Sequence, residues 1–291
     1  MKSIRTRQRI ERSGRVILLL CALLSIATVC LITLFIFQQG VPTFKSVPLK
    51  EFLFSSNWSP SASDPHYGIL SFVVASFWVT FLSLLFTTPI ALSCAIYLAL
   101  FAKGRAASLL RTSLELLAGI PSIIFGLFGI AVVVPFVRNV FGGNGYSLLS
   151  ASIILAIMIL PTVINVSEVS IYAVSNELRD ASVALGATQW QTISRVVLPS
   201  SRSGIVASLV LGLGRAIGET TAVLLVGGNA PLFPTSVLDM GRTLTMNIVT
   251  DMSYAEGVHM SALFATAMLL FIVILSLNFV VVAITKRSRI K

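Results

Sequence analysis

Six long apolar runs divide this chain, and they restrict its fold more than any other feature of the sequence. A helix rises about 1.5 Å per residue, so about 20 apolar residues cross the roughly 30 Å hydrocarbon core of a bilayer. The chain has 291 residues, of which 56% are hydrophobic and 11% charged, and a soluble domain of this size does not need so much apolar surface. We therefore predict an all-α, polytopic membrane protein with six transmembrane helices: Val16 to Phe37, Ile69 to about Leu98, about Leu114 to Phe136, Ser147 to Val166, Gly204 to Val226, and Ser261 to Ile284.

The first two runs carry local signals of their own. The run from Val16 to Phe37 is longer than the apolar core of a cleaved signal peptide, and it does not end in a small-residue cleavage site. We expect it to be a retained first span. The second run continues to Ala102, which is too long for one straight crossing, so Pro89 is expected to kink it or to end its membrane part.

The lysines and arginines predict the orientation of the spans. With the N-terminus in the cytoplasm, cytoplasmic segments hold 16 of the 21 cationic residues, outer segments hold four, and Arg215 lies within a span. This bias predicts that both termini are cytoplasmic, and it accounts for the net charge of +10 without nucleic acid. The cytoplasmic cations are Lys2, Arg5, Arg7, Arg9, Arg12, Arg15, Lys103, Arg105, Arg111, Arg179, Arg195, Arg202, Lys286, Arg287, Arg289 and Lys291, and the outer ones are Lys45, Lys50, Arg138 and Arg242.

Several classes of protein are disfavoured by what the sequence lacks. The three cysteines lie in apolar runs and the two histidines are isolated, so no disulfide framework and no metal site is expected. There is no GxxxxGK[ST] motif, so the chain should not bind ATP through a P-loop of its own. An intramembrane enzyme is also disfavoured, because the spans contain no Ser/His/Asp set and no nucleophile motif.

A charged pair stands inside the fifth run. Arg215 and Glu219 are the only charged residues between Gly204 and Val226, and a buried charge costs roughly 2.5 to 3.5 kcal/mol on insertion scales. Their i, i+4 spacing is expected to place them on one helix face, close enough to pair, and Gly214 and Gly218 fit a small-xxx-small packing interface. One interpretation is a neutralised pair that holds helices together. The favoured interpretation is an anion pathway, in which Glu219 orients the planar donor fork of Arg215, and both can hold together.

The segment from Asn176 to Ile205 connects the fourth and fifth runs on the predicted cytoplasmic side. Apolar and charged residues alternate in its first part as in a short surface helix, and Gly186 is expected to end that helix. A second helical stripe is expected to stop before Pro199, and its residues are Trp190, Ile193, Val196 and Val197. A helix, a glycine turn and a helix would suit a knob that fits a groove in a partner.

This loop resembles the EAA loop of ABC importer permeases, whose pattern is E-A-A, three residues, G, nine residues, and I-x-L-P. The spacing is intact here, with Asp in place of Glu, Ser in place of the second Ala and Val in place of Ile. The resemblance implies that the loop is the coupling segment that docks on a separate ATPase subunit. The residues that carry it are Asp180, Ala181, Ser182, Gly186, Val196, Leu198 and Pro199.

Three further stretches narrow the resemblance to phosphate ABC importer permeases. GRAIGETTAVLLVGGN, from Gly214, looks like the corresponding span of that family, and LELLAGIPSIIFGLFGIAVVVPF, from Leu114, resembles their third span. The segment from Thr243 to Asn278 looks like the PstC-type subunit rather than its PstA-type partner. The resemblance implies a type I importer (MetI-like) core. It divides the chain into residues 1–67 (N-terminal tail, first span and outer loop), 68–285 (transmembrane domain, with the coupling loop at about 176–203) and 286–291 (cytoplasmic tail).

The resemblance also implies a function and a set of partners. The chain would be a multi-pass permease subunit in the cell inner membrane that forms the phosphate pathway with a second, PstA-like permease. Two PstB-like ATPase subunits would hold the ATP and Mg, so this chain would need no cofactor, and a PstS-like binding protein would deliver phosphate from outside.

Alternatives stay open at this point. The chain could serve another oxyanion or take the PstA-type role, or it could be an anion transporter that works without ATP, although the EAA-like spacing would then be a coincidence. Three weaker candidate sites remain. In the segment Gly119 to Ser122, Gly-x-Pro can kink or break a helix and expose amides to an anion. Glu115 lies one turn before this segment, and Asn278 in the sixth run is expected to be structural.

Overall fold

The computed structural model describes residues 2–288, with side chains described between Gly14 and Phe279. The predicted cations of both tails, apart from Arg15, and residues 289–291 of the expected C-terminal tail lie outside this description. The helices are α1 (Lys2–Gly40), α2 (Thr43–Ser46), α3 (Leu49–Phe54), α4 (Leu70–Leu100), α5 (Gly104–Gly119), α6 (Ser122–Phe128), α7 (Val134–Phe141), α8 (Leu148–Tyr172), α9 (Asn176–Ala184), α10 (Gln189–Thr192), α11 (Leu198–Gly218), α12 (Thr221–Val226), α13 (Leu244–Asp251) and α14 (Gly257–Ser288). π-Helical turns at Gly129–Val133 and Ile193–Val197 join α6 to α7 and α10 to α11.

In the part of the chain that the structure describes, six helical segments are long and apolar enough to cross a membrane, which confirms the number of spans predicted from the sequence. They are Gly14–Ser46, Leu70–Leu100, Ser122–Phe141, Leu148–Tyr172, Gln189–Gly218 and Gly257–Phe279. The third begins at Ser122 rather than near Leu114, because the chain leaves helical geometry at Ile120 before Pro121. Pro89 does not end the second span, since α4 continues through it to Leu100.

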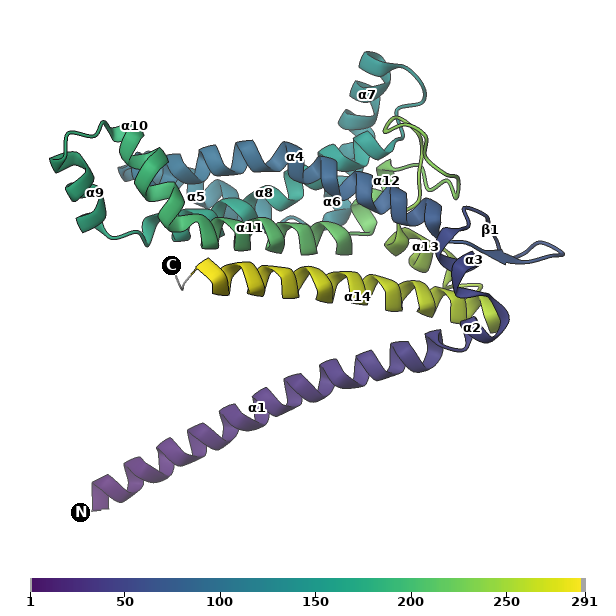
Figure 1. Cartoon of the computed structure of the whole chain (residues 1–291), viewed down its shortest axis with the longest axis horizontal. Helices are drawn as coiled ribbons and strands as arrows, with labels where there is room; N and C mark the ends of the chain where they lie inside the picture. The colour runs from purple at the N-terminus through teal and green to yellow at the C-terminus, as the bar shows by residue number, and fades with distance from the viewer. Residues whose placement is uncertain (1, 289–291) are drawn as a thin grey trace.

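The only strands in the described chain form a two-residue hairpin, β1 (Trp58–Ser59) and β2 (His66–Tyr67), with Trp58 opposite Tyr67. The hairpin projects from one end of the molecule, close to α13 and the start of α14 (Figure 1). We call this the hairpin end. The opposite end carries α9 and α10, and we call it the loop end. α1 begins and α14 ends on the side of the loop end (Figure 1).

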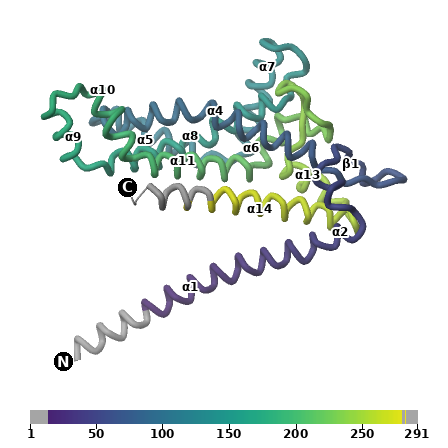
Figure 2. Tube along the Cα trace, viewed as in Figure 1, coloured from purple at the N-terminus to yellow at the C-terminus, as the bar shows by residue number. Residues whose placement is uncertain are grey.

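The bundle is built around α4, α8 and α11, which run side by side, with α14 along one flank (Figure 1). α1 stands away from this bundle and approaches α14 only near the hairpin end, as the trace in Figure 2 shows. There the rings of Phe35 and Phe264 meet edge to face, 5.6 Å apart. None of the most apolar window of α1 is buried, so its apolar side chains remain available to lipid or to another subunit.

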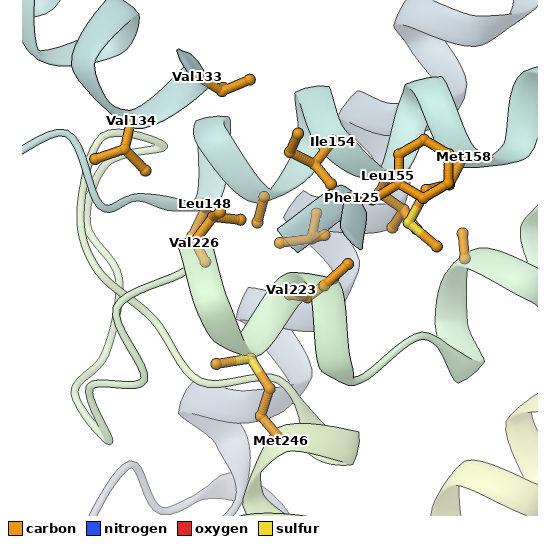
Figure 3. Close-up of a cluster of buried hydrophobic side chains, with 14 of the residues drawn as sticks. Phe125, Val133, Val134, Leu148, Ile154, Leu155, Met158, Val223, Val226 and Met246 are labelled. Carbon is orange, nitrogen blue, oxygen red and sulfur yellow. The ribbon is translucent and has the colours of Figure 1, made fainter. Parts of the chain in front are cut away.

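A buried apolar cluster fixes the short helices near the middle of the bundle (Figure 3). Phe125 from α6 and Val223 and Val226 from α12 join α8 residues in this cluster, and Met246 from α13 lies on the other side of α12. Gly126 lies so close to the Leu225 side chain that an added Cβ would clash with it. The packing therefore holds α6 and α12 together and sets α13 against α12.

Candidate functional site

The fifth span is broken at the predicted charged pair. α11 ends at Gly218, Glu219 is extended with φ −74° and ψ 130°, and α12 starts at Thr221. The expectation of one helix from Gly204 to Val226 is therefore wrong. Glycine is a poor helix former and two β-branched threonines follow Glu219, so the local sequence favours a break. The Glu219 carboxylate accepts a hydrogen bond from the Ala222 N–H at 3.3 Å, which helps to begin α12.

The break separates Arg215 from Glu219. The Arg215 guanidinium donates to the Thr162 hydroxyl on α8 at 3.1 Å, while the Glu219 side chain turns toward the start of α12. Among the described residues no ion pair joins the two, so the expected i, i+4 contact is not formed. The sequence-based interpretation assumed that helical geometry continues past Gly218, and it does not. Arg215 thus keeps most of its donors free for another acceptor.

The helix face around Arg215 is left uncovered by the residues that the structure describes. Arg215 and Leu211 are exposed, and an added Cβ at Gly214 or at Gly218 would meet nothing within 4 Å. The predicted small-residue interface at these glycines is therefore not used within the chain. α11 packs on α8 through a different set of small residues, which are Gly204, Ser208 and Gly212.

A second break lies at the predicted Gly119 to Ser122 site. α5 ends at Gly119, Ile120 has φ −69° and ψ 127°, and α6 begins at Ser122. The chain is therefore broken here rather than merely kinked. The helices that follow the two breaks, α6 and α12, pack against each other. Glu115 is exposed, and the described residues give its carboxylate no partner.

The EAA-like loop, which we define as residues 176–203, has the predicted helix, turn and helix. α9 ends at a turn in which Gly186 has φ +82°, a conformation that favours glycine. The Gly186 N–H donates to the Val183 carbonyl at 2.9 Å, and the Ala187 N–H to the Ser182 carbonyl at 3.2 Å. Thr188 then begins α10, and its hydroxyl accepts from the Gln191 N–H while the Gln191 side chain accepts from the Thr188 N–H.

The structure places the seven motif residues in different environments. Asp180 and Ala181 are exposed on α9, Gly186 is exposed at the turn, and Pro199 is exposed at the start of α11. Ser182 contacts the second helix, with its hydroxyl 3.0 Å from that of Thr192. Val196 and Leu198 are half-buried. The expected stop before Pro199 is wrong, because the π-helical turn passes directly into α11 and Pro199 sits in its first turn, where a missing N–H is tolerated.

The EAA-like loop presents apolar side chains that no described residue covers. Leu185 is 90% exposed and Trp190 is 66% exposed, and Leu178 and Val183 on α9 are also exposed. Trp190 was expected to share one stripe with Ile193 and Val197, yet those two are buried and Trp190 points away. An exposed tryptophan beside exposed aliphatic residues is typical of a contact surface for another protein.

Arg179 is a site residue that the sequence-based interpretation missed. Its guanidinium donates to the Ile171 carbonyl at 2.9 Å, near the end of α8, where a cation complements the helix dipole. It also lines a cavity of about 400 Å³ with Leu100 and Thr192, beneath the loop. The only signal for this role in the sequence was a cation early in α9, eight residues after Ile171.

The sequence matches the family model described as "Binding-protein-dependent transport system inner membrane component" over residues 89–290. It is 40% identical over 257 residues to "Probable ABC transporter permease protein YqgH" of Bacillus subtilis, which covers 87% of this chain and 83% of that protein. It is 33% identical over 242 residues to "Phosphate transport system permease protein PstC" of Xylella fastidiosa, covering 76% of this chain and 74% of that protein. For "Phosphate transport system permease protein PstC 2" of Mycobacterium tuberculosis the identity is 31% over 275 residues, covering 85% and 84%.

Two solved transporters share the fold. The MetNI methionine ABC transporter in an inward-facing conformation gives a TM-score of 0.59 at 22% identity, over 76% of this chain and 95% of that chain. A bacterial alginate ABC transporter, in complex with a pentasaccharide-bound periplasmic protein, gives 0.63 at 19% identity, over 94% and 96%. At these identities the likeness concerns the fold alone.

Proposed function

The chain belongs to the family of inner-membrane components of binding-protein-dependent transport systems, and on that premise we propose that it is a PstC-type permease subunit of an ATP-driven phosphate importer. The predicted fold class, a six-span type I importer core, is confirmed by the family match and the structural neighbours. The substrate is carried over from relatives whose names state phosphate. A permease supplies a path, so in this proposal the chain itself makes and breaks no bond.

One observation carries the proposal, which is an exposed arginine beside a helix break in the middle of a membrane-spanning bundle. Phosphate carries one to two negative charges and meets a large desolvation barrier in a dry passage. The guanidinium of Arg215 offers planar paired donors to an oxyanion, and its one described partner is the neutral Thr162 hydroxyl. Glu219, four residues further along the chain, turns toward the start of α12 and does not pair with Arg215 among the described residues.

The uncovered face around Arg215 fits a shared pathway. Gly214 and Gly218 leave space beside the guanidinium, and small residues allow a second helix to come close. We propose that a second permease subunit packs along this face and that phosphate passes between the two chains.

We propose that the EAA-like loop docks on separate ATPase subunits, which would hold ATP and Mg. Conformational changes driven by ATP hydrolysis would then be transmitted to this chain through the loop. Its exposed apolar side chains, Leu185 and Trp190 foremost, fit a groove in such a partner. The Ser182–Thr192 contact braces α9 against α10, and Arg179 ties α9 to α8. Because α10 continues into α11, a displacement of the loop would move the helix that carries Arg215.

The orientation follows from the charge bias of the sequence. With the loop end in the cytoplasm, most cations lie there, and both termini are cytoplasmic. The hairpin end then faces outward, where a solute-binding protein would deliver phosphate. The rival assignments, a PstA-type role, another oxyanion or transport without ATP, differ in the partners and solutes they require.

Substitution of Arg215 tests the proposal. In the assembled transporter, Arg215→Gln should lower uptake of labelled phosphate by at least about tenfold, since removing a charge partner costs several kcal/mol in a dry site, while assembly and basal ATPase activity persist. Arg215→Lys should retain part of the uptake, because it keeps the charge and loses the fork. Arg138→Gln, which removes an exposed cation on α7, is the matched control and should leave uptake unchanged.

Glu219→Gln tests the charge of Glu219 separately from its structural role at the start of α12. A glutamine oxygen can still accept from the Ala222 N–H, so the break should persist while the negative charge beside Arg215 is lost. We expect altered uptake in a normally assembled subunit.

An Arg215→Gln subunit that is degraded or unassembled would instead assign the arginine to helix packing, and one that transports at the normal rate would remove it from the pathway.

A further inference from the structure

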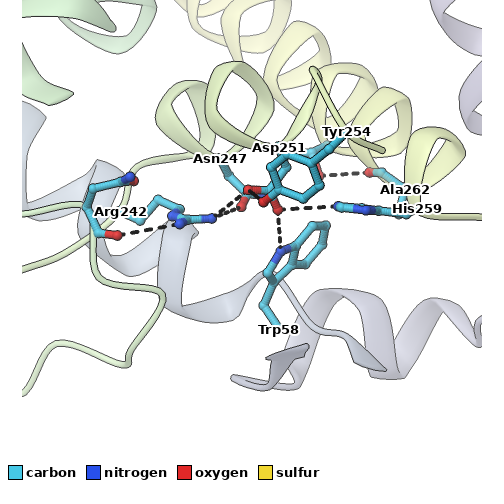
Figure 4. Close-up of polar contacts among 9 residues, drawn as sticks. Trp58, Arg242, Asn247, Asp251, Tyr254, His259 and Ala262 are labelled. Atoms are coloured by element: carbon cyan, nitrogen blue, oxygen red, sulfur yellow. Dashed lines mark hydrogen bonds and ion pairs between the residues drawn. The ribbon is translucent and has the colours of Figure 1, made fainter. Parts of the chain in front are cut away.

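At the hairpin end, the side chain of Asp251 is contacted by polar side chains from separated segments (Figure 4). We call Asp251 and these partners, Trp58, Arg242, Tyr254 and His259, the Asp251 cluster. Its carboxylate accepts from the Trp58 indole N–H at 2.9 Å, from Arg242 at 3.0 Å and from the Tyr254 hydroxyl at 2.6 Å. The His259 Nε2 lies 3.3 Å away. Asp251 is 1% exposed, and a buried carboxylate of this kind is stable only while such partners surround it.

Asp251 is the last residue of α13, and the first turn of the same helix contacts the break in the fifth span. The Thr245 hydroxyl donates to the Glu219 carbonyl at 3.2 Å, and Thr245 is buried. Thr245 and Asp251 stand about 9 Å apart along the helix axis. One short helix therefore connects the Asp251 cluster to the backbone of Glu219.

Arg242 makes a second connection on the far side of α12. Besides Asp251 it donates to the Asn247 side chain at 3.1 Å and reaches the Asn229 carbonyl at 3.5 Å. Asn229 follows α12, and Glu219 precedes it. One end of the short helix after the break is thus contacted by Thr245 of α13, and the segment after its other end by Arg242, a direct partner of Asp251.

The cluster is incompletely satisfied. Six buried side-chain polar atoms in the described residues have no hydrogen-bond partner. Four of them belong to this region, on Asn229, Arg242, Asn247 and Thr250. These atoms leave spare donors and acceptors beside the partners of Asp251.

We infer that Asp251 and Thr245 are positioning residues that set the conformation of the Glu219 break from the hairpin end, by way of α13. The inference rests on the proposed function only in taking Arg215 and Glu219 as pathway residues. On the proposed orientation, contact with a binding protein at the hairpin would act on Trp58, and α13 would carry the displacement to Glu219. Neither residue touches the solute.

The test measures the break directly. Gly218→Cys is introduced into the assembled transporter after replacement of Cys21, Cys30 and Cys94, because residue 218 adjoins the break, lies on the face proposed to line the pathway, and has open space around an added Cβ within this chain. The rate at which this introduced thiol reacts with N-ethylmaleimide is then compared in Asp251→Asn and Thr245→Val, each of which nearly preserves side-chain shape. We expect each to change the rate by at least about threefold in the same direction, and the double variant to match the singles, since residues in one chain of contacts are not additive.

Thr250→Val is the matched control. It makes the same substitution on the same helix, but the Thr250 hydroxyl has no partner to lose, so the reaction rate of the introduced thiol should stay unchanged. Equal effects of Thr245→Val and Thr250→Val, or independent additive effects of Thr245→Val and Asp251→Asn, would overturn the inference. If Asp251→Asn does not assemble, Thr245→Val against Thr250→Val still decides the link to the break.

Phosphate uptake by the same variants separates this inference from the proposed function. Thiol reactivity requires no phosphate, so a changed reaction rate of the introduced thiol supports the positioning role even where the transporter carries another solute. Uptake should fall in Thr245→Val and stay normal in Thr250→Val, and it should be restored by Thr245→Ser, which keeps the hydroxyl. Normal uptake in Thr245→Val together with an unchanged thiol reaction rate would contradict the inference while leaving the role of Arg215 untouched.

Discussion

Gly186 is the residue on which the shape of the EAA-like loop depends. It has φ +82°, and a Cβ there would meet nothing within 4 Å, so backbone conformation alone restricts substitution. A residue with a side chain costs roughly 1–2 kcal/mol in this conformation, and a β-branched one is less tolerated still. We expect Gly186→Ile to uncouple ATP hydrolysis from transport or to release the ATPase, which co-purification with ATPase and uptake assays would show.

Gly104 supplies the control for that substitution. It has φ +60° and equally open space, but it begins α5, outside the loop. Gly104→Ile should therefore impose similar strain without uncoupling. If both variants lose transport to the same degree, the effect is general destabilisation and the docking role of the loop is not supported.

Protonation of the Asp251 carboxylate is expected to make the Asp251 cluster sensitive to acid. Burial of its carboxylate opposes ionisation, but hydrogen bonds from Tyr254 and Trp58 and the charges of Arg242 and His259 outweigh it, so the pKa of Asp251 lies below its ordinary value. A lowered folded-state pKa gives stability that is present above about pH 4, the ordinary value of an aspartate, and lost as pH falls through the lower folded value.

The fluorescence of Trp58 reports this loss. In a chain with Trp78→Phe and Trp190→Phe, we expect the Trp58 emission to stay constant from neutral pH down to about pH 4 and to shift below it, because the indole N–H then loses its carboxylate acceptor. Asp251→Asn should remove the transition. A transition centred near pH 6 that survives Asp251→Asn would assign the effect to another group.

At the scale of elements, the contact between α8 and α11 depends on small residues. The hydroxyls of Ser167 and Ser208 are 2.7 Å apart and buried, and a Cβ on Gly204 would collide with the Ser170 side chain. We expect Gly204→Leu to separate the two helices and to lower the thermal unfolding temperature of the purified subunit by several degrees, as overpacking costs about 1–3 kcal/mol.

Gly214→Leu is the matched control on the same helix, because open space surrounds that position. It should leave the isolated subunit as stable as the unmodified chain, since leucine forms helix better than glycine. In the proposed assembly the same variant should weaken packing of the second permease. Equal destabilisation of the isolated subunit by the two variants would contradict the assignment of the two faces.

The elements that the sequence predicts well are those fixed by local pattern. The six spans follow from apolar length, and the helix, glycine turn and helix of the EAA-like loop follow from Gly186 and its neighbours. The break at Glu219 was missed because the i, i+4 charge spacing also fits a continuous helix, although Gly218 and the threonines after it were available signals. The Asp251 cluster was out of reach, since Trp58 and Asp251 are 193 residues apart and only tertiary packing joins them.

At the scale of the whole molecule, three surfaces are left uncovered by the described residues. α1 leaves its apolar residues uncovered, the Arg215 face is open, and the loop end presents Leu185 and Trp190. Lipid, a second permease and an ATPase would cover these three surfaces in turn. The assignment requires the loop end and the hairpin end to lie on opposite sides of the membrane.

That requirement gives a direct test of topology. Ser236 lies in the segment between α12 and α13 at the hairpin end, Ser200 lies at the start of α11 near the loop end, and both are exposed. In a chain without native cysteines, Ser236→Cys should react with an impermeant thiol reagent added to intact cells, and Ser200→Cys should react only after the membrane is permeabilised. The physical reason is the bias of cations toward the loop end, which retains that side in the cytoplasm. The opposite labelling would place the EAA-like loop outside the cell, where no ATPase subunit can reach it, and would end the importer assignment together with the orientation.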